Sequence, residues 1–273
     1  EKIQKNTSTM IPDQQFLSQE QVATTVLTLA DDKLSKILNG KIIPGDRVFY
    51  PVKPHITSSI PIVEKSNFNG KKCSFTQSDH NSVEDTNKTN TIMRTLQAEG
   101  CVLNDTSLLD ELKDIDLFIN STGNIPANYP KLTELIRNDW DNLVDSFIIA
   151  PALIAQKALG TFVPGGDVDP RLFKDAKGTI VIIGPDLPVG KKISGHERAK
   201  IEVFRGALRA FTTTVNQELS DVLKSNIRVF LILPGTVDGK EPRYENIPDT
   251  INYLMSDKAR LSSEVIFCPD ETR

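Results

Sequence analysis

Short, mainly apolar runs alternate with long amphipathic segments over most of this chain. The runs have the length of buried strands, and the longest is IRVFLIL at residues 227–233. The strands predicted in this way are residues 72–76, 101–103, 115–120, 179–183 and 227–233. The helices predicted between them are residues 86–99, 107–113, 140–159 and 197–223. This alternation is typical of a parallel sheet with helices on both faces, so we predict an α/β fold with a doubly wound sheet.

The N-terminal region has a different pattern. Residues 19–32 place their apolar side chains near one face of a helix, and residues 41–50 form an extended segment. Residues 53–69 carry prolines but no regular apolar period, which is typical of a linker or a covering loop. Near the other end of the chain, residues 263–268 (SEVIFC) suit a further strand at the edge of the sheet.

Composition and charge argue against several classes of function. The chain has 36 acidic and 32 basic residues, so its net charge of −4 is opposite to the basic bias of a duplex-binding protein. No uninterrupted apolar run approaches about eighteen residues, so we expect no membrane-spanning segment. The opening residues have no initiator Met and no apolar signal region. We therefore expect an internal start or a fragment, and a cytoplasmic rather than a secreted protein.

The cysteines and histidines show no ligand pattern. Cys73, Cys101 and Cys268 lie far apart along the chain, and the three histidines share no ligand spacing. We therefore predict no metal site, no disulfide framework, and reduced thiols as is usual in the cytoplasm.

The order of the central segments is more specific than an α/β pattern alone. One predicted strand ends in Asn-Ser-Thr-Gly, the next helix begins with Trp140-Asp141, and the last long strand ends in Pro-Gly-Thr. Over residues 70–239 this order resembles the short-chain dehydrogenase/reductase family, in which the corresponding strands end in Asn-Asn-Ala-Gly and Pro-Gly. The resemblance implies a Rossmann-like fold. The vestigial positions of the family's cofactor-binding motifs are Asn120, Gly123, Pro234, Gly235 and Thr236.

The N-terminal region carries a second resemblance to the same family. FLSQEQVATTVLTLADDKLSKILNGKIIPGDRVF is similar to the helix and strand that close such a unit. Because this closing helix and strand come before the first strand of the unit at residues 70–239, the resemblance implies two units in tandem, as in bacterial malonyl-CoA reductases. We therefore expect residues 1–52 to close a preceding unit, residues 53–69 to be a linker, and residues 70–273 to form a degenerate second unit. The strand at residues 41–50 is then expected to pack against another polypeptide.

The first turn of this second unit lacks the chemistry of a dinucleotide site. Such a site needs glycines after the first strand, so that backbone N–H groups reach the pyrophosphate at a helix N-terminus. No glycine occurs between Ser74 and Thr95, and the carboxylates of Asp79, Glu84 and Asp85 would repel phosphates. We expect no cofactor in this chain, and the resemblance implies NADPH in a partner reductase unit.

The family's catalytic residues are also missing. Active members use a Tyr with a Lys four residues later on one helix face, and none of the four tyrosines here is followed by Lys at that spacing. Counting back from VNQEL, near the end of the long helix, puts Ile201 and Arg205 at these two positions. Gly184-Pro185 replaces the catalytic Ser, and Phe147 replaces the expected Asn. We therefore predict that this unit has no catalytic residue.

One other pair keeps the spacing of the missing one. His196 and Lys200 are four residues apart, and a histidine is able to act as the acid. The helix register puts this pair before the expected turn. We therefore interpret the segment as a solvated helix start, with Lys200 pointing outward, and keep His196 and Lys200 only as weak catalytic candidates.

These observations favour a non-catalytic structural or dimerisation unit of an NADPH-dependent enzyme similar to malonyl-CoA reductase. Its partner would be a preceding active reductase unit or chain, in a homodimer or heterodimer of reductase units, with no nucleic acid and no membrane. Two alternatives stay open. One is a docking or regulatory unit of another tandem or heterodimeric acyl-thioester ketoreductase, and the other is a module that binds a different ligand in the old cofactor cleft. The apolar stripe at residues 204, 208, 211 and 215 suits either the core or an interface.

Overall fold

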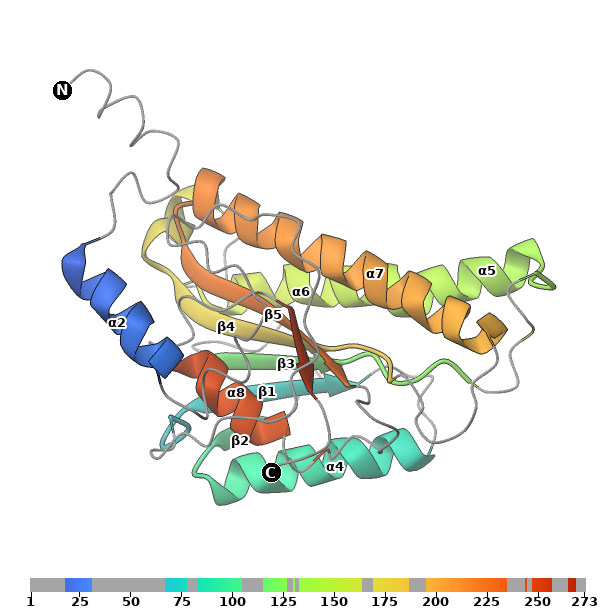
Figure 1. Ribbon diagram of the computed structural model, residues 1–273, viewed down its shortest axis with the longest axis horizontal. Helices are drawn as coiled ribbons and strands as arrows, with labels where there is room; N and C mark the ends of the chain where they lie inside the picture. The colour runs from blue at the N-terminus through green and yellow to red at the C-terminus, as the bar shows by residue number, and fades with distance from the viewer. Residues whose placement is uncertain are drawn as a thin grey trace.

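Six parallel strands form the sheet in the computed structural model (Figure 1). Their order across the sheet is β2-β1-β3-β4-β5-β6, and every pairing is parallel. The strands are β1 (Lys72–Gln77), β2 (Val102–Asn104), β3 (Leu117–Ser121), β4 (Lys177–Ile183), β5 (Asn226–Pro234) and β6 (Val265–Cys268). The last strand lies at the edge, as predicted from SEVIFC.

The structure describes residues 18–30, 67–77, 83–104, 115–126, 130, 133–163, 169–186, 195–234, 244, 247–256 and 265–268. The strand predicted at residues 41–50 and the helix predicted at residues 107–113 lie outside the described residues, as does most of the linker predicted at residues 53–69.

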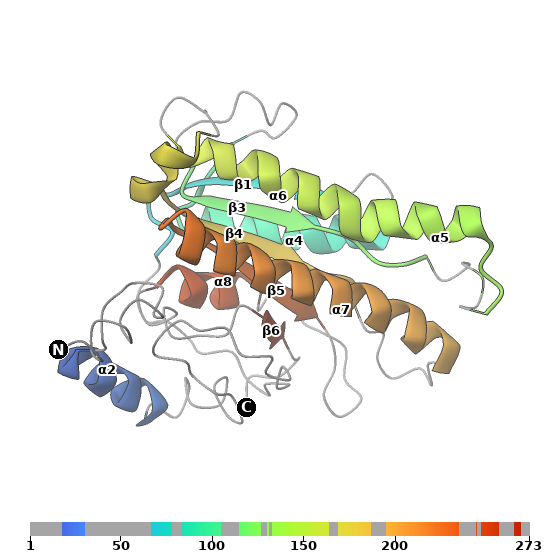
Figure 2. The same cartoon turned by 90° about the horizontal axis from the view of Figure 1, so that it is seen from above.

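Helices cover both faces of the sheet (Figure 2). The α-helices are α2 (Gln19–Ala30), α4 (Val83–Ala98), α5 (Arg137–Val144), α6 (Ala150–Thr161), α7 (Gly195–Gln217) and α8 (Ile247–Met255). A π-helical turn joins α5 to α6 at Asp145–Ile149, a second one extends α7 over Glu218–Val222, and Pro170–Asp175 is a 3-10 helix. Because α4 and α8 pack on one face and α6 and α7 on the other, the predicted doubly wound α/β fold is confirmed.

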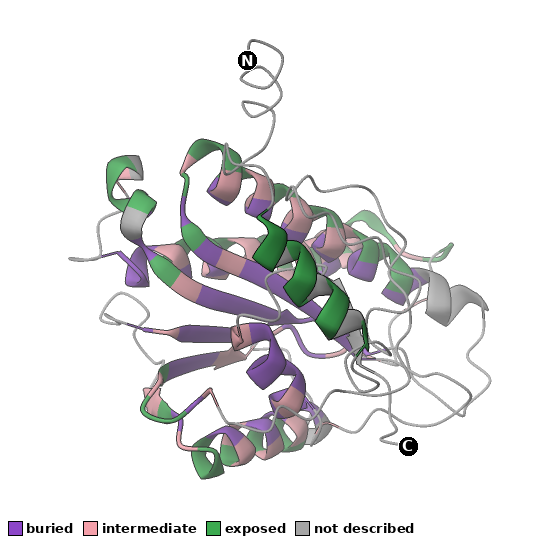
Figure 3. Cartoon of the chain, turned by 60° about the vertical axis from the view of Figure 1, so that its left-hand side comes forward, coloured by how far each residue is buried: buried purple, intermediate pink, exposed green. Residues whose placement is uncertain are grey.

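The core consists of two apolar layers, one on each face of the sheet. Leu117 and Ile119 of β3 belong to the layer beneath α4 and α8, and Phe118 between them belongs to the layer beneath α6 and α7. Successive side chains of a strand point to opposite faces, so a strand covered on both sides needs apolar residues at every position. This explains the continuous apolar runs of β3, β4 and β5, which Figure 3 shows as buried. Phe204 and Leu208 of the apolar stripe on α7 are buried in the core.

The direction of winding changes between β1 and β3. From β1 the chain passes through α4 to β2 at one edge, and then returns to β3 and continues through β4 and β5 to the other edge. In open α/β sheets, ligands bind beyond the carboxyl ends of the strands at such a switch point. Here β1 ends at Gln77 and β3 ends at Ser121, so a candidate site is sought beyond these two residues.

Helix α2 stands apart from both layers. Its described side chains are all exposed, including the apolar ones of Val22, Val26 and Leu27 (Figure 3). The expectation that residues 1–52 close a preceding unit depends mainly on the strand at residues 41–50, and therefore stays a prediction.

One described helical run, Arg137–Thr161, is long and apolar enough to cross a membrane by length and composition alone. The expectation of no spanning segment considered only uninterrupted apolar runs, and this run contains charged residues. Phe147, Ala155 and Ala158 of the run are buried against other parts of the chain, and one third of its most apolar window is buried. These contacts are those of a helix packed on a sheet.

The prediction of reduced thiols is wrong for two of the three cysteines. Cys73 of β1 and Cys101, which precedes β2, form a disulfide with a Cα–Cα distance of 6.2 Å. The two residues are 28 positions apart, but the β1-α4-β2 crossover places neighbouring parallel strands side by side. Sequence spacing carries no information about this pairing, because it depends on the strand order.

Candidate functional site

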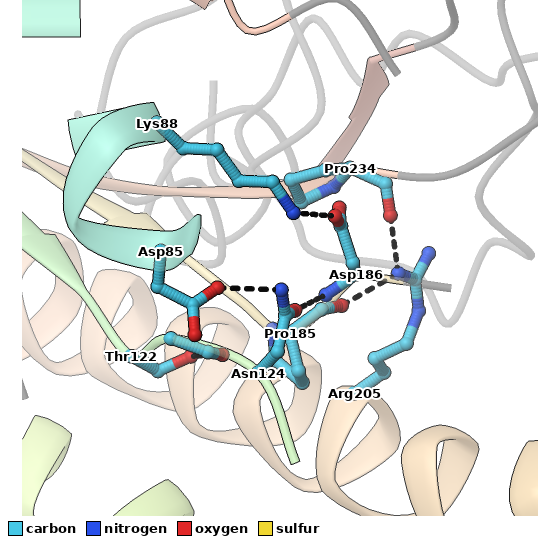
Figure 4. Close-up of polar contacts among 9 residues, drawn as sticks. Asp85, Lys88, Thr122, Asn124, Pro185, Asp186, Arg205 and Pro234 are labelled. Carbon is cyan, nitrogen blue, oxygen red and sulfur yellow. Dashed lines mark hydrogen bonds and ion pairs between the residues drawn. The ribbon is translucent and has the colours of Figure 1, made fainter. Parts of the chain in front are cut away.

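Four polar side chains meet at the carboxyl edge of the sheet, beside the switch point (Figure 4). Asn124, which follows β3, donates from Nδ2 to Asp85 Oδ1 on α4 at 2.7 Å and accepts at Oδ1 from the backbone N–H of Asp186 at 2.7 Å. Asp186, which follows β4, forms an ion pair with Lys88 on α4, with 3.2 Å between Oδ2 and Nζ. We call Asp85, Lys88, Asn124 and Asp186 the edge network. It joins α4 to the ends of β3 and β4.

The charges of the edge network are largely removed from water. The side chain of Asp186 is 8% exposed and that of Lys88 is 20% exposed. The Lys88 ammonium also lies 4.8 Å from the centroid of the Tyr244 ring, a favourable cation–π distance. Burial raises the pKa of Asp186, and this shift is opposed by the Tyr244 side chain and by the positive charges of Lys88 and Arg205. Perturbed carboxylates of this kind occur at functional sites and in structural ion-pair networks.

Arg205 borders the edge network on the α7 side. The residue is 3% exposed, and its Nη1 donates to the carbonyl oxygens of Pro185 at 2.8 Å and Pro234 at 2.6 Å. One guanidinium nitrogen therefore joins the chain that follows β4 to the end of β5. Because a guanidinium keeps its proton at any physiological pH, Arg205 is unsuited to proton transfer. Its contacts are those of a structural residue.

The positions that correspond to the family's cofactor-binding motifs make structural contacts where the structure describes them. Asn120, buried at the end of β3, donates from Nδ2 to Thr76 Oγ1 on β1 at 2.9 Å. Gly123 has a φ of 70°, a left-handed conformation that favours glycine. Pro234 ends β5 and accepts the hydrogen bond from Arg205. Gly235 and Thr236 lie outside the described residues.

Lys200 is buried, so the expectation that it points outward is wrong. It is 4% exposed, and its Nζ donates to the carbonyl oxygen of Pro130 at 2.8 Å. A lysine buries its aliphatic stem readily when its ammonium group finds an acceptor. Lys200 therefore connects α7 to the segment that precedes α5. His196 lies in the first turn of α7, and its side chain is outside the described part of the structure.

Apolar contacts occupy the remaining catalytic positions of the family. Ile201 on α7 is buried. Phe147 is buried in the π-helical turn, with its ring centroid 5.6 Å from that of Phe204. A Cβ atom at Gly184 would lie 2.7 Å from the side chain of Leu233, so a serine there requires Leu233 to move.

Within the described residues, the first turn of α4 differs from that of a dinucleotide site. A pyrophosphate needs free backbone N–H groups and close approach at this helix terminus. Here the buried carboxylate of Asp85 lies in that turn, and the Lys88–Asp186 ion pair extends from α4 to the end of β4. The described residues also contain no group of three His, Cys, Asp or Glu side chains able to hold a metal ion.

Sequence reasoning missed most of the edge network. It identified Asp85 only as a source of repulsion toward phosphate, and it did not identify Lys88, Asn124 or Asp186. Asn124 and Asp186 each follow a predicted strand within a few residues, and this position was an available signal because the carboxyl ends of parallel strands share one edge. Lys88 gave no comparable signal, since its partner Asp186 is 98 residues away.

Comparison with solved structures identifies the fold. The chain is similar to an enoyl-acyl-carrier-protein reductase (NADH) of Aquifex aeolicus, with 16% identity, a TM-score of 0.52, and coverage of 73% of this chain and 95% of that one. It is similar to a gluconate 5-dehydrogenase of Burkholderia cenocepacia in complex with NADP and tartrate, with 13% identity, a TM-score of 0.53, and coverage of 74% and 94%. A short-chain dehydrogenase/reductase of Serratia marcescens matches with 15% identity, a TM-score of 0.53, and coverage of 74% and 97%.

At these identities the comparisons show the fold alone, which is the Rossmann-like fold of short-chain dehydrogenase/reductases. No protein-family model matches the sequence, and no curated protein matches it.

Proposed function

We propose that this chain is a non-catalytic structural unit that docks onto an active, NADPH-dependent reductase unit, in an enzyme similar to malonyl-CoA reductase. The edge network is the observation that carries the proposal. Its four side chains occupy the carboxyl edge at the switch point, where a reductase of this fold would receive its ligand. The chain therefore fills this edge with its own side chains.

The residues at the family's Tyr and Lys positions are also unsuited to donate a proton in carbonyl reduction. Arg205 keeps its proton, and Ile201 has none to transfer. Asp186 is a buried titratable group close enough to feel the charge of Arg205, but its Oδ2 is engaged by Lys88 at 3.2 Å. A unit with these residues supports the reaction of a neighbour without taking part in it.

The outer face of α6 and α7 is suited to contact the partner unit. Ile149, at the end of the π-helical turn, and Leu153 on α6 are about half exposed, and Val203 on α7 is 40% exposed. Gly206, in the middle of the 23-residue helix α7, has open space beyond its Cα. Glycine weakens a helix interior, and no contact within the described structure requires it here. Close approach of a second helix would account for it.

The proposed substrate follows from the resemblance of residues 1–52 and 70–239 to malonyl-CoA reductases. The active unit would reduce malonyl-CoA to malonate semialdehyde, or onward to 3-hydroxypropionate. This chain would supply packing surface and no residue that contacts the thioester.

Calorimetric titration of the chain with NADPH tests the central claim. We expect no saturable heat, because Asp85 and the Lys88–Asp186 pair fill the binding edge. An active short-chain dehydrogenase titrated in the same buffer is the positive control. Binding with a Kd of about 1 μM, which corresponds to roughly −8 kcal/mol, would contradict the proposal. A reductase assay of the full-length parent with malonyl-CoA and malonate semialdehyde tests the substrate.

A further inference from the structure

The buried stripe of α4 changes character halfway along the helix. Among the α4 side chains that the structure describes, Asp85 and Thr89 are buried in the first half, and Ile92 and Leu96 are buried in the second half. Their spacing places them on one face of the helix. Ile92 and Leu96 belong to the apolar layer beneath α4 and α8. From Asp85 to Thr89, α4 therefore presents polar groups to the protein, whereas its second half is part of the core.

The first half of α4 contacts the rest of the protein through polar side chains. Asp85 accepts from Asn124 at 2.7 Å, and Lys88 pairs with Asp186 at 3.2 Å. Thr86 Oγ1 accepts a hydrogen bond of 3.4 Å from the side chain of Gln77. Polar contacts exchange with water at modest net gain, whereas burial of Ile and Leu side chains gains the full hydrophobic free energy. The second half is consequently held more strongly than the first.

Intrinsic helix propensity changes at the same point. The first half reads VEDTNKTNT, in which Thr, Asn, Asp and Val all form helices poorly. The second half reads IMRTLQA and contains Met, Arg, Leu, Gln and Ala, which form helices well. The Thr91 hydroxyl also donates to the carbonyl oxygen of Asn87 in the first half, and such a bond weakens a helix slightly. Its low helix propensity and its weaker attachment to the core therefore both favour a local opening in the first half of α4.

We propose that residues 83–90 of α4 form a gate that opens by local unfolding while residues 92–98 remain docked on the core. Opening separates Asp85 and Lys88 from Asn124 and Asp186, and so uncovers the carboxyl edge at the switch point. The edge that is closed in the folded state is then accessible to solvent and ligand in a minor state of the same protein. Such sub-global openings lie between fraying and global unfolding in free energy.

Amide hydrogen exchange of the whole chain, measured by NMR or mass spectrometry with peptides that resolve the two halves of α4, tests the gate. In the wild type, the amides of residues 84–90 should exchange faster than those of residues 92–98 after correction for intrinsic rates. The double variant Asn87→Ala, Asn90→Ala changes only exposed positions and raises helix propensity. It should slow exchange of residues 84–90 by about tenfold and leave residues 92–98 unchanged.

Asn124→Ala removes the partner of Asp85 and should accelerate exchange of residues 84–90. Arg94→Ala, at an exposed position in the second half, is the matched control and should leave residues 84–90 at the wild-type rate. Equal protection of both halves, or a change of both halves together in the double variant, would show that α4 opens as one unit and would overturn the proposal. Exchange in β5 serves as the internal measure of global unfolding in every variant.

Discussion

Asn216 on α7 and Val229 on β5 exchange two hydrogen bonds, as two strands do. The Asn216 amide donates to the Val229 carbonyl oxygen at 2.6 Å, and its Oδ1 accepts from the Val229 N–H at 2.9 Å. The edge strand β6 pairs with β5 only from Leu231 onward. Asn216 therefore completes the backbone hydrogen bonding of β5 just before its strand partner begins.

Replacing Asn216 by Ala should lower the free energy of unfolding by roughly 2 kcal/mol, because it leaves a buried N–H and a buried carbonyl unpaired. Urea denaturation followed by far-UV circular dichroism measures this loss. Thr214→Ala on the same helix is the control, since the Thr214 hydroxyl is exposed and bonds only within α7. If both variants unfold at the same urea concentration, Asn216 does not stabilise the edge of β5.

Arg205→Met should destabilise the fold by roughly 2–4 kcal/mol, since it leaves the carbonyl oxygens of Pro185 and Pro234 without this donor and removes one of the two positive charges that act on buried Asp186. Thermal and urea unfolding measure the change. Glu202→Gln is the matched control on the same helix, because Glu202 is half exposed and lies 3.9 Å from Arg205, and its effect should stay within about 0.5 kcal/mol. If Arg205→Met is as stable as the wild type, Arg205 has no structural role.

The strands and long helices could be predicted from sequence because each of them carries its own apolar pattern. The run IRVFLIL is buried on both faces, so its sequence alone specifies β5. The edge network has no such local signature. Lys88 and Asp186 meet only because the strand order brings α4 beside the end of β4. The helical pattern predicted an exposed Lys200, which is wrong because the acceptor of its ammonium group is the backbone carbonyl of Pro130, far away in the sequence.

The disulfide predicts the number of free thiols. Under denaturing, non-reducing conditions, Ellman titration should detect one thiol per chain, that of Cys268, and three after reduction. Reduction should also lower stability by roughly 3–4 kcal/mol, because the bond closes a loop of about 28 residues in the unfolded chain. The variant Cys268→Ser is the control and should show no free thiol before reduction. Three thiols in the untreated protein would exclude the bond.

His196 and Lys200 should be dispensable for turnover in the full-length enzyme. The double Ala variant is expected to keep its rate per folded molecule within about threefold, less than 1 kcal/mol. Lys200→Ala alone should still reduce stability by roughly 1–2 kcal/mol, because it removes the donor to Pro130. Active-site titration together with unfolding curves separates the two effects. A hundredfold loss of rate in folded protein would identify a real acid in this pair.

Gly206 gives a test of the docking face. Gly206→Ala should stabilise the isolated chain by up to about 1 kcal/mol, because alanine favours the helix and its Cβ meets open space. Gly206→Lys should weaken association with the partner unit or with a second copy by at least about tenfold, measured by analytical ultracentrifugation. Asn87→Lys, which adds the same charge on exposed α4, is the control. Unchanged association in Gly206→Lys would place the interface elsewhere.

The carboxylate of Asp85 in the first turn of α4 also changes how this domain responds to its surroundings. A domain that binds a nucleotide gains stability by mass action, so its melting temperature follows the ligand concentration. Here the carboxylate of Asp85 is part of the chain itself, so its amount does not vary with the concentration of any ligand. Under the proposed function, the stability of this domain would not follow the concentration of NADPH.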